Sequence, residues 1–257
     1  GNYPHIQKVG AVYLFNGVGA DFSGLTWRKK LTSSSGAVDM PAVGSGDYFG
    51  AAVALDGDRL VVGAPADNPG PGTVHLFTGV GTDFSGLTWQ KQLTSNQGAT
   101  HMPNLPSYSR FGASVALDGD RLVVGALEGD PVHIAIPGGG VYLFTGVGTD
   151  FSGLTLQKKL TWQGSGAINM PTAAPEDFGR ALALDGDRLV VSADTNEDGG
   201  VTEYGEVHLF TGVGTDFSGL TWQKKLTWGE GAVGMPLQSY AYSAYGDHRW
   251  FGRSVAL

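Results

Sequence analysis

The sequence predicts an all-β fold, and three observations support this prediction. The chain of 257 residues contains 42 Gly and 12 Pro, which is typical of short strands joined by many turns. Its apolar residues occur in short runs, rich in β-branched and aromatic side chains, between Gly, Asp and Pro. One long segment also recurs, and each copy opens with a Phe-Gly pair, at Phe49-Gly50, Phe111-Gly112, Phe178-Gly179 and Phe251-Gly252. Such a period indicates a repeat architecture.

Each complete unit reads as four successive strands, which the first unit places at residues 49–55, 59–64, 73–77 and 89–94. An Asp-Gly-Asp turn separates the first two strands, and we expect its aspartates to form a tight hairpin turn in which Gly takes a positive φ. The second strand is apolar on both faces, as in a strand between neighbouring sheets, whereas the fourth strand alternates and carries basic residues, as an outer edge does. Four-stranded antiparallel sheets repeated radially form a β-propeller, so we predict four-stranded antiparallel blades.

The whole chain, residues 1–257, is predicted to form a single β-propeller domain. Units start at about residues 49, 111, 178 and 251, and residues 1–48 supply only a third and a fourth strand, at 11–15 and 27–32. Because the ends complement each other, we expect a ring of four blades in which the termini share one blade, with 1–48 completing it. Residues 5–7 would then serve as a substitute second strand. The alternative is that the chain is a piece of a longer array, or that another subunit completes this blade.

Two repeated features are predicted to serve the scaffold. The segment GVGTDFSGLT recurs between the third and fourth strands, at residues 79–88, 146–155 and 212–221, and we expect its Phe to point inward and its Asp to cap a turn. The methionines all precede Pro in the loops before the next unit, at Met40, Met102, Met170 and Met235. We interpret them as apolar anchors rather than as a soft-metal site.

Histidines replace a tyrosine in the third strand of two units. His75 and His208 occupy the slot of Tyr13 and Tyr142, in VHLF and VYLF. We predict that they are strand surface residues and not ligands.

The order of Phe-Gly, an apolar strand, Gly63-Ala64-Pro65, a VYLF or VHLF strand and a basic strand ending in KLT resembles the FG-GAP repeat of integrin α-chain propellers and of bacterial secreted proteins. The resemblance covers nearly the whole chain, although later copies replace Gly-Ala-Pro by Gly-Ala-Leu and Ser-Ala-Asp. It implies a propeller that is secreted, extracellular or at the cell surface, with adhesion or ligand binding as its function. In integrin propellers a long Asp-rich loop between the first and second strands binds calcium. Here that loop is only Asp-Gly-Asp, so the resemblance carries no calcium site to it.

Composition and motifs argue against several function classes. A net charge of −8 opposes binding to nucleic acid, and no apolar run approaches the roughly 18 residues of a membrane-spanning helix. The chain has no Cys and contains no zinc-protease, nucleophile-elbow or phosphate-loop motif, so we predict that it is not an enzyme.

The loops that join the second to the third strand, and the fourth to the next first strand, differ between copies. Both sets emerge at the same face, which we take as the candidate binding surface. Clustered aromatic and polar residues there suit stacking on a sugar or contact with a protein. The predicted ligand-binding residues are Trp162, Trp228, Tyr240, Tyr242, Tyr245, Asp247, His248, Arg249 and Trp250. Alternatively, these rings form the core of a long loop.

One loop also offers a candidate calcium site. Asp194, Asn196 and Asp198, followed by Gly, match the opening of a calcium loop, but its twelfth position is Gly205 instead of an acid. The leading hypothesis is an extracellular, non-catalytic binding or adhesion module for a glycan or a protein. The alternative is a structural subunit that self-assembles through its split blade, and a hydrolase-like enzyme comes third.

Overall fold

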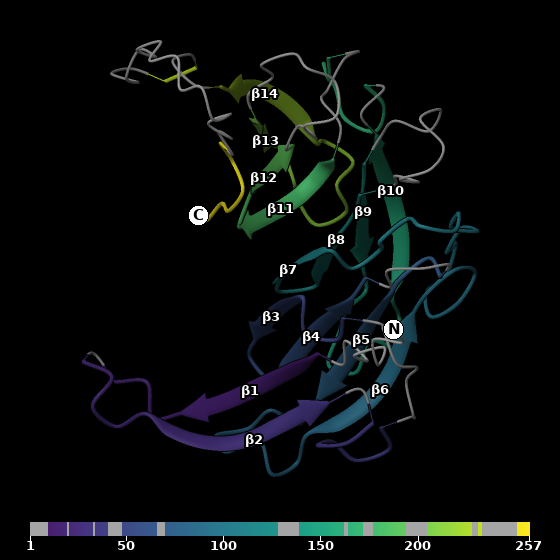
Figure 1. Cartoon of the computed structure of the whole chain (residues 1–257). Helices are drawn as coiled ribbons and strands as arrows, with labels where there is room; N and C mark the ends of the chain where they lie inside the picture. Colours follow the sequence, from purple (N-terminus) through teal and green to yellow (C-terminus); the bar gives the residue numbers. More distant parts are fainter. Residues whose placement is uncertain are drawn as a thin grey trace, which may run out of the picture.

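The computed structural model describes residues 10–19, 21–32, 34–40, 48–65, 70–127, 139–161, 164–171, 177–193, 205–227, 231–232 and 251–257, and all regular structure within them is β-strand (Figure 1). The strands are β1 (Ala11–Asn16), β2 (Thr26–Thr32), β3 (Ala52–Asp56), β4 (Arg59–Ala64), β5 (Thr73–Thr78), β6 (Thr88–Leu93), β7 (Ser114–Asp118), β8 (Arg121–Ala126), β9 (Gly140–Thr145), β10 (Thr155–Thr161), β11 (Phe178–Asp185), β12 (Arg188–Ala193), β13 (Glu206–Thr211) and β14 (Thr221–Leu226). The predicted all-β class is confirmed.

The strands form one two-stranded sheet, β1-β2, and three four-stranded sheets, β3-β4-β5-β6, β7-β8-β9-β10 and β11-β12-β13-β14. Every pair is antiparallel and joins strands that follow each other in sequence, so each sheet is a simple meander. In Figure 1 the sheets follow one another in chain order, from β1-β2 at the bottom to β11-β14 at the top. This arrangement confirms the predicted propeller blades.

The hydrophobic cores lie between sheets and not within any one of them. Each sheet has a trailing face that packs on the next sheet and a leading face that packs on the previous one. The trailing face of β3-β6 presents Val61, Val74, Leu76 and Leu93, and the leading face of β7-β10 covers them with Phe111, Tyr142, Phe144, Val147 and Phe151. The junction between β7-β10 and β11-β14 repeats this pattern, as does the one between β1-β2 and β3-β6.

Each Phe-Gly pair docks on the sheet before its own. Phe49, Phe111 and Phe178 are fully buried there, whereas Phe251, which the repeat predicts to be equivalent, is only half-buried. Glycine allows the closest approach of two sheets, because a Cβ atom on Gly125 would overlap the carbonyl oxygen of Gly179. The residue in the slot of Gly125 in β12 is Ser192, whose hydroxyl accepts a hydrogen bond from Ala181 N.

The described residues do not close a ring. Residues 251–257, predicted as the first strand of the shared blade, are in no strand and are not paired with β1. Phe251 and Val255 instead pack beside Val190 and Val207 of the β11-β14 sheet. A strand needs a hydrogen-bonded neighbour, and β1 does not lie beside this segment. Residues 5–7 lie outside the described ones, so the shared blade and the single-domain boundary remain predictions.

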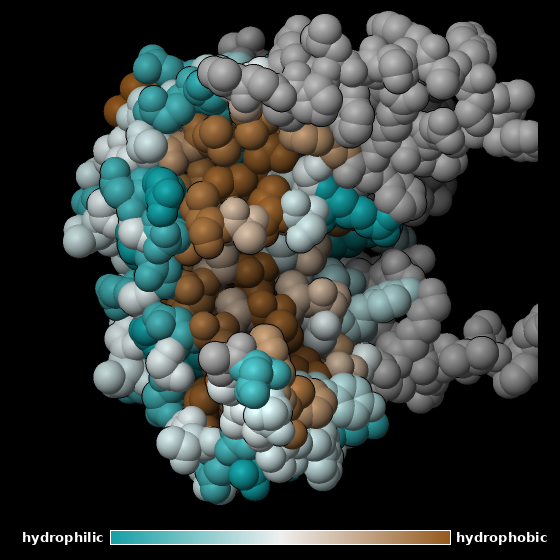
Figure 2. Space-filling view, turned by 90° about the vertical axis from the view of Figure 1, so that its left-hand side faces the viewer, coloured by the Kyte–Doolittle hydropathy of each residue, from teal (hydrophilic) through white to brown (hydrophobic). Residues whose placement is uncertain are grey.

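Apolar residues form a column along the side of the molecule where β3, β7 and β11 lie (Figure 2). Val53 and Leu55 of β3 contribute exposed side chains, whereas the matching Val115 of β7 is buried. The difference arises because the sheet before β3 contains only β1 and β2 among the described residues, and these correspond to the third and fourth strands of a unit. β7 has the first strand of the preceding sheet, β3, as its neighbour, whereas β3 has no such neighbour in the described part of the chain.

Candidate functional site

The sequence-predicted binding residues lie outside the described part of the chain. This applies to the aromatic and polar set Trp162, Trp228, Tyr240, Tyr242, Tyr245, Asp247, His248, Arg249 and Trp250, and to the calcium candidates Asp194, Asn196 and Asp198. Their flanks are described: Ala193 ends β12 and Gly205 precedes β13, and both are buried. Both sets therefore remain predictions. The faces of the molecule are defined below by the residues that the structure describes.

One face is built from the repeated turns and is called here the constant face. It carries the Asp-Gly-Asp turns at 56–58, 118–120 and 185–187 and the loops at 79–87, 146–154 and 212–220. The carboxylate of Asp58 accepts hydrogen bonds from Gly79 N at 3.0 Å and Gly81 N at 2.8 Å. Asp120 and Asp187 make the same bonds in their own sheets, and those from Gly214 and Gly212 lower the pKa of Asp187. The predicted role of these aspartates in turns is confirmed.

The GVGTDFSGLT loops have the predicted structural role. Phe84, Phe151 and Phe217 are buried between sheets. The carboxylates of Asp83, Asp150 and Asp216 accept hydrogen bonds from the amides two residues later, at Ser85, Ser152 and Ser218. These bonds cap the turn, so the constant face consists of groups that satisfy one another.

The opposite face carries the loops that differ between copies and is called here the variable face. Tyr108 N donates to Gly70 O at 3.3 Å and Phe111 N donates to Pro71 O at 2.9 Å. These bonds join the loop before β5 to the loop before β7, so the two loop sets meet at one face as predicted. Met102 and Met170 are buried in the cores beneath it and Met40 packs against a third core, which confirms the anchor role of these three, whereas Met235 lies outside the described residues.

The residue directly before each Phe-Gly pair has a fixed backbone and a changing side chain. Tyr48, Arg110 and Asp177 have φ values of 50°, 48° and 57°, which are uncommon for residues other than Gly. Each carbonyl accepts a hydrogen bond from the amide three residues later, and each residue is half-buried. These three residues are called here the entry positions, and they lie just before β3, β7 and β11.

A sequence pattern marks the entry positions. The residue before Phe-Gly is different in all copies, while the pair itself is constant. Trp250 occupies the fourth of these slots and was included among the predicted ligand residues, whereas Tyr48, Arg110 and Asp177 were missed. The slot presents an aromatic ring at Tyr48, a positive charge at Arg110 and a negative charge at Asp177. Asp177 is paired with Arg180 at 3.5 Å.

The prediction that His75 and His208 are strand surface residues is wrong, because both side chains are completely buried. Their slot is on the leading face, where the ring of Phe49 contacts His75 and the ring of Phe178 contacts His208. Burial lowers the pKa of His75 to about 4, which keeps its imidazole neutral near pH 7. His75 Nδ1 accepts a hydrogen bond from the indole of Trp89 at 3.3 Å. It is therefore a satisfied core residue.

His208 lies in a more polar setting. Its Nδ1 accepts a hydrogen bond from the indole of Trp222, and its Nε2 lies 3.2 Å from Glu206 Oε2 without hydrogen-bond geometry. The other Glu206 oxygen accepts a hydrogen bond from Lys225. Burial opposes ionisation of Glu206, but its contacts with His208 and Lys225 outweigh this and lower its pKa. Among the described residues, no group of three or more His, Asp or Glu side chains could hold a metal ion.

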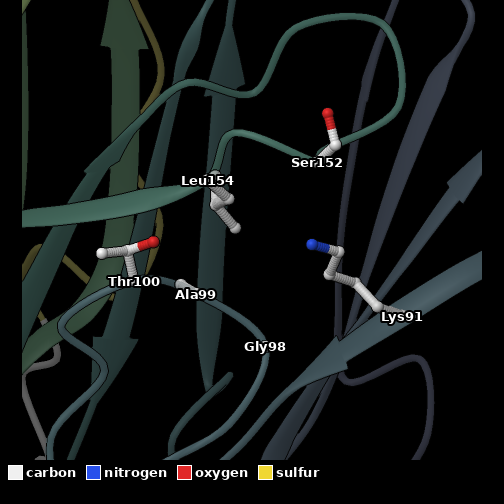
Figure 3. A pocket seen from close by; sticks show the side chains of 6 residues that line it. All are labelled: Lys91, Gly98, Ala99, Thr100, Ser152 and Leu154. Carbon is white, nitrogen blue, oxygen red and sulfur yellow. The ribbon is translucent and has the colours of Figure 1, made fainter.

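A pocket of about 450 Å³ lies at the seam between two sheets, lined by Lys91, Gly98, Ala99, Thr100, Ser152 and Leu154 (Figure 3). Thr100 N donates to Leu154 O and Thr100 O accepts from Leu156 N, both at 2.9 Å. The next seam repeats this pairing through Ile168, and Lys158 Nζ there donates to Ser218 O at 3.3 Å. Because the backbone pairing beside the pocket recurs at the next seam, this pairing does not distinguish a functional site.

The repeated antiparallel sheets, packed face to face in chain order, define a repeat protein of the β-propeller class. The chain matches the FG-GAP repeat over residues 28–77, 103–144 and 172–210 and belongs to the FG-GAP repeat family. FG-GAP repeats are typically adhesion or binding modules, are generally non-catalytic, and occur commonly in extracellular or surface proteins. No curated protein matches the chain at a significant level. The described residues include no helix long and apolar enough to cross a membrane.

Proposed function

We propose that this chain is an extracellular, non-catalytic binding module that recognises a glycan or a protein through its variable face. The observation that carries this proposal is the set of entry positions, where one backbone conformation holds Tyr48, Arg110 and Asp177 in turn. A scaffold that fixes the backbone and varies the side chain presents different chemistry at equivalent places. Family membership supports the same class of function.

The aromatic loop residues and Trp250 extend this surface in the proposal. Tyr and Trp provide large contact areas at low cost in side-chain entropy, and Arg and Asp donate and accept hydrogen bonds from hydroxyl groups. A sugar offers both an apolar ring face and hydroxyl groups, so entry positions that carry Tyr48 and Arg110 provide groups that suit it.

The proposal is tested by binding of the labelled protein to arrays of immobilised glycans and extracellular proteins. We expect Tyr48→Ala or Arg110→Ala to weaken binding of whichever array ligand is found by about tenfold or more, as for residues that carry recognition. Thr149→Ala is the matched control, because Thr149 is exposed on the constant face. Equal loss in all three variants, or no loss in any, would place recognition elsewhere.

We also propose that Asp194, Asn196 and Asp198 bind calcium at the loop between β12 and β13. Alternating oxygen ligands followed by Gly match the first half of a calcium loop, and an acid other than residue 205 must complete it. Titration calorimetry with calcium chloride tests this. We expect binding that Asp198→Asn weakens at least tenfold and that Asp83→Asn leaves unchanged, and no heat beyond dilution would refute it.

A further inference from the structure

The pocket of about 450 Å³ in Figure 3 lies between two complete four-stranded sheets, β3-β6 and β7-β10, and is called here the seam pocket. Lys91 of β6 borders it on one side, and Ser152 and Leu154 from the loop before β10 border it on the other. Residues 98–100, in the segment that crosses the seam after β6, complete its wall. Pockets of about 300 to 1,000 Å³ are usual for sites that bind small molecules, so its size suits such a ligand.

Side chains of different chemistry converge on the seam pocket. In Figure 3 the amino group of Lys91, the hydroxyl of Thr100 and the side chain of Leu154 point into the same space. Leu154 is buried and provides an apolar wall, whereas Lys91 is half-buried and brings a positive charge to the opening. The pocket thus combines a cationic donor, a hydroxyl group and an apolar surface, which is the usual make-up of a small-molecule site.

The amino group of Lys91 is free to bind a ligand. Lys91 pairs with Leu76 in its own sheet as Lys158 pairs with Leu143, so the two lysines occupy the same slot. Lys158 Nζ donates to the carbonyl oxygen of Ser218 in the following sheet at 3.3 Å. Within the described part of the chain, Lys91 makes no hydrogen bond or ion pair of this kind. An anionic group can therefore accept a charge-assisted hydrogen bond from Lys91 without first breaking a bond inside the protein.

Thr100 is the second feature that sets this seam apart. Val38 and Ile168 occupy the same slot at the other seams, and all three residues form the same backbone bridge to the following sheet. The scaffold thus uses only the backbone of this residue. The Thr100 hydroxyl has no hydrogen-bond partner among the described residues, and the other two seams have an apolar side chain in its place. A polar group that the repeat does not need points to a ligand.

The charges around the seam pocket select the kind of anion. Hydrogen bonds from Ser152 and, to a smaller extent, the charge of Lys91 lower the pKa of Asp150, so a carboxylate also lies near this lysine. A doubly charged phosphate would be repelled by Asp150 and would meet only one cation, whereas a group with a single negative charge suits one lysine. A carboxylate has two oxygens, which can accept hydrogen bonds from Lys91 and Thr100 together.

We propose that the seam pocket binds a sugar acid, with Lys91 and Thr100 donating to the two carboxylate oxygens and Leu154 contacting the carbon skeleton. Ser152 and the backbone at residues 98–99 add hydrogen-bonding groups at the rim, which suits a ligand that carries hydroxyl groups beside its carboxylate. The site is built from β6, the crossing segment and the loop before β10, and not from the entry positions. It is therefore a second binding site, separate from the variable face.

NMR titration of isotope-labelled protein with glucuronate, and with glucose as its neutral match, tests the proposal. We expect glucuronate to shift the amide signals of Thr100 and Ser152 and to bind about tenfold or more tightly than glucose, since a hydrogen bond to a charged group is at stake. Lys91→Gln removes the charge and Thr100→Ile installs the residue of the next seam, and each should raise the Kd for glucuronate by a similar factor. Lys158→Gln is the matched control and should leave this Kd unchanged.

Thermal unfolding verifies that each variant is folded, and Thr100→Val, with the residue of the first seam, serves if Thr100→Ile does not fold. Equal affinity for glucuronate and glucose, or no saturable shift with either, would overturn the proposal. So would a Lys158→Gln variant that loses as much affinity as Lys91→Gln, because the effect would then be one of general charge. Inorganic phosphate that binds as tightly as glucuronate would also overturn it. These variants keep Tyr48 and Arg110, so the proposed function of the variable face stands or fails separately.

Discussion

The arginines that bond across the seams between sheets allow a controlled measurement, because among the described residues the motif Asp-Gly-Asp-Arg occurs twice with a docked following sheet, at Arg59 and Arg121, and once without one, at Arg188. Arg121 and Arg188 have the same local sequence and the same ion pair with an aspartate three residues earlier. Only Arg121 also donates to the carbonyls of Gly186 and Gly214, at 2.6 and 2.9 Å. Replacing each arginine by Ala separates the contribution of docking from that of the local turn.

We expect Arg121→Ala to cost about 2 to 4 kcal/mol in the free energy of unfolding. A hydrogen bond to a charged donor contributes about 1.5 to 3 kcal/mol, and two are lost, although water entering the vacated space recovers part of this. Arg188→Ala removes an exposed ion pair and should cost at most about 1 kcal/mol. Arg121→Lys should fall between the two, because an ammonium group cannot span both carbonyls as the planar guanidinium does.

Urea-induced unfolding, followed by tryptophan fluorescence at protein concentrations where the chain is monomeric, provides the comparison. An unchanged slope of unfolding free energy with urea would show that the variants differ only in stability. Equal costs for Arg121→Ala and Arg188→Ala would refute the reasoning, since the arginine would then act within its own hairpin and not between sheets.

Two further predictions concern buried positions. The pKa of His75 in the folded state is about 4, below the ordinary 6.5, because burial disfavours the charged imidazole. The unfolded chain therefore takes up a proton at this residue before the folded chain does. Up to about 3 kcal/mol of the free energy of unfolding is lost as the pH falls from 6.5 to 4, and none of it is lost above pH 6.5. The double variant His75→Tyr, Trp89→Leu copies the pair found in the β7-β10 sheet and should remove this loss, as urea unfolding across that pH range would show; a persistent loss would assign it to other groups. Gly125→Ser should cost about 1 to 3 kcal/mol or more, because the new Cβ overlaps the carbonyl of Gly179, whereas Ser192→Gly should cost only about 1 kcal/mol through the lost hydrogen bond from Ala181; similar thermal stabilities for the two variants would contradict this.

The fold was predictable because the same turn residues recur at the same places in every unit. The Asp-Gly-Asp turns and the alternation of the strands define hairpins locally, and the order of strands follows from those hairpins. Packing between sheets was not predictable in the same way. His75 looked like a surface residue because histidine in an alternating strand is commonly exposed, and only the approach of Phe49 and the previous sheet makes it a core residue.

The candidate site was less accessible to sequence reasoning. Aromatic richness drew attention to the loop before Trp250, but the entry positions depend on a backbone conformation that composition does not reveal. Tyr48, Arg110 and Asp177 share no chemistry, and their equivalence appears only when their positive φ values are compared. A slot that varies beside an invariant pair is the signal that could have found them.

Because the apolar contacts lie between sheets and nearly the same set of side chains recurs on each trailing face, a unit carries half of two interfaces and the whole of none. A duplicated unit would therefore meet a neighbour whose Val and Leu slots already match its own. The slot of Gly125 is an exception, because Ser192 occupies it in β12 and a Cβ at Gly125 would overlap the carbonyl oxygen of the following sheet. The number of units in such an array can thus change through repeated use of the same apolar seam, provided that this slot is glycine.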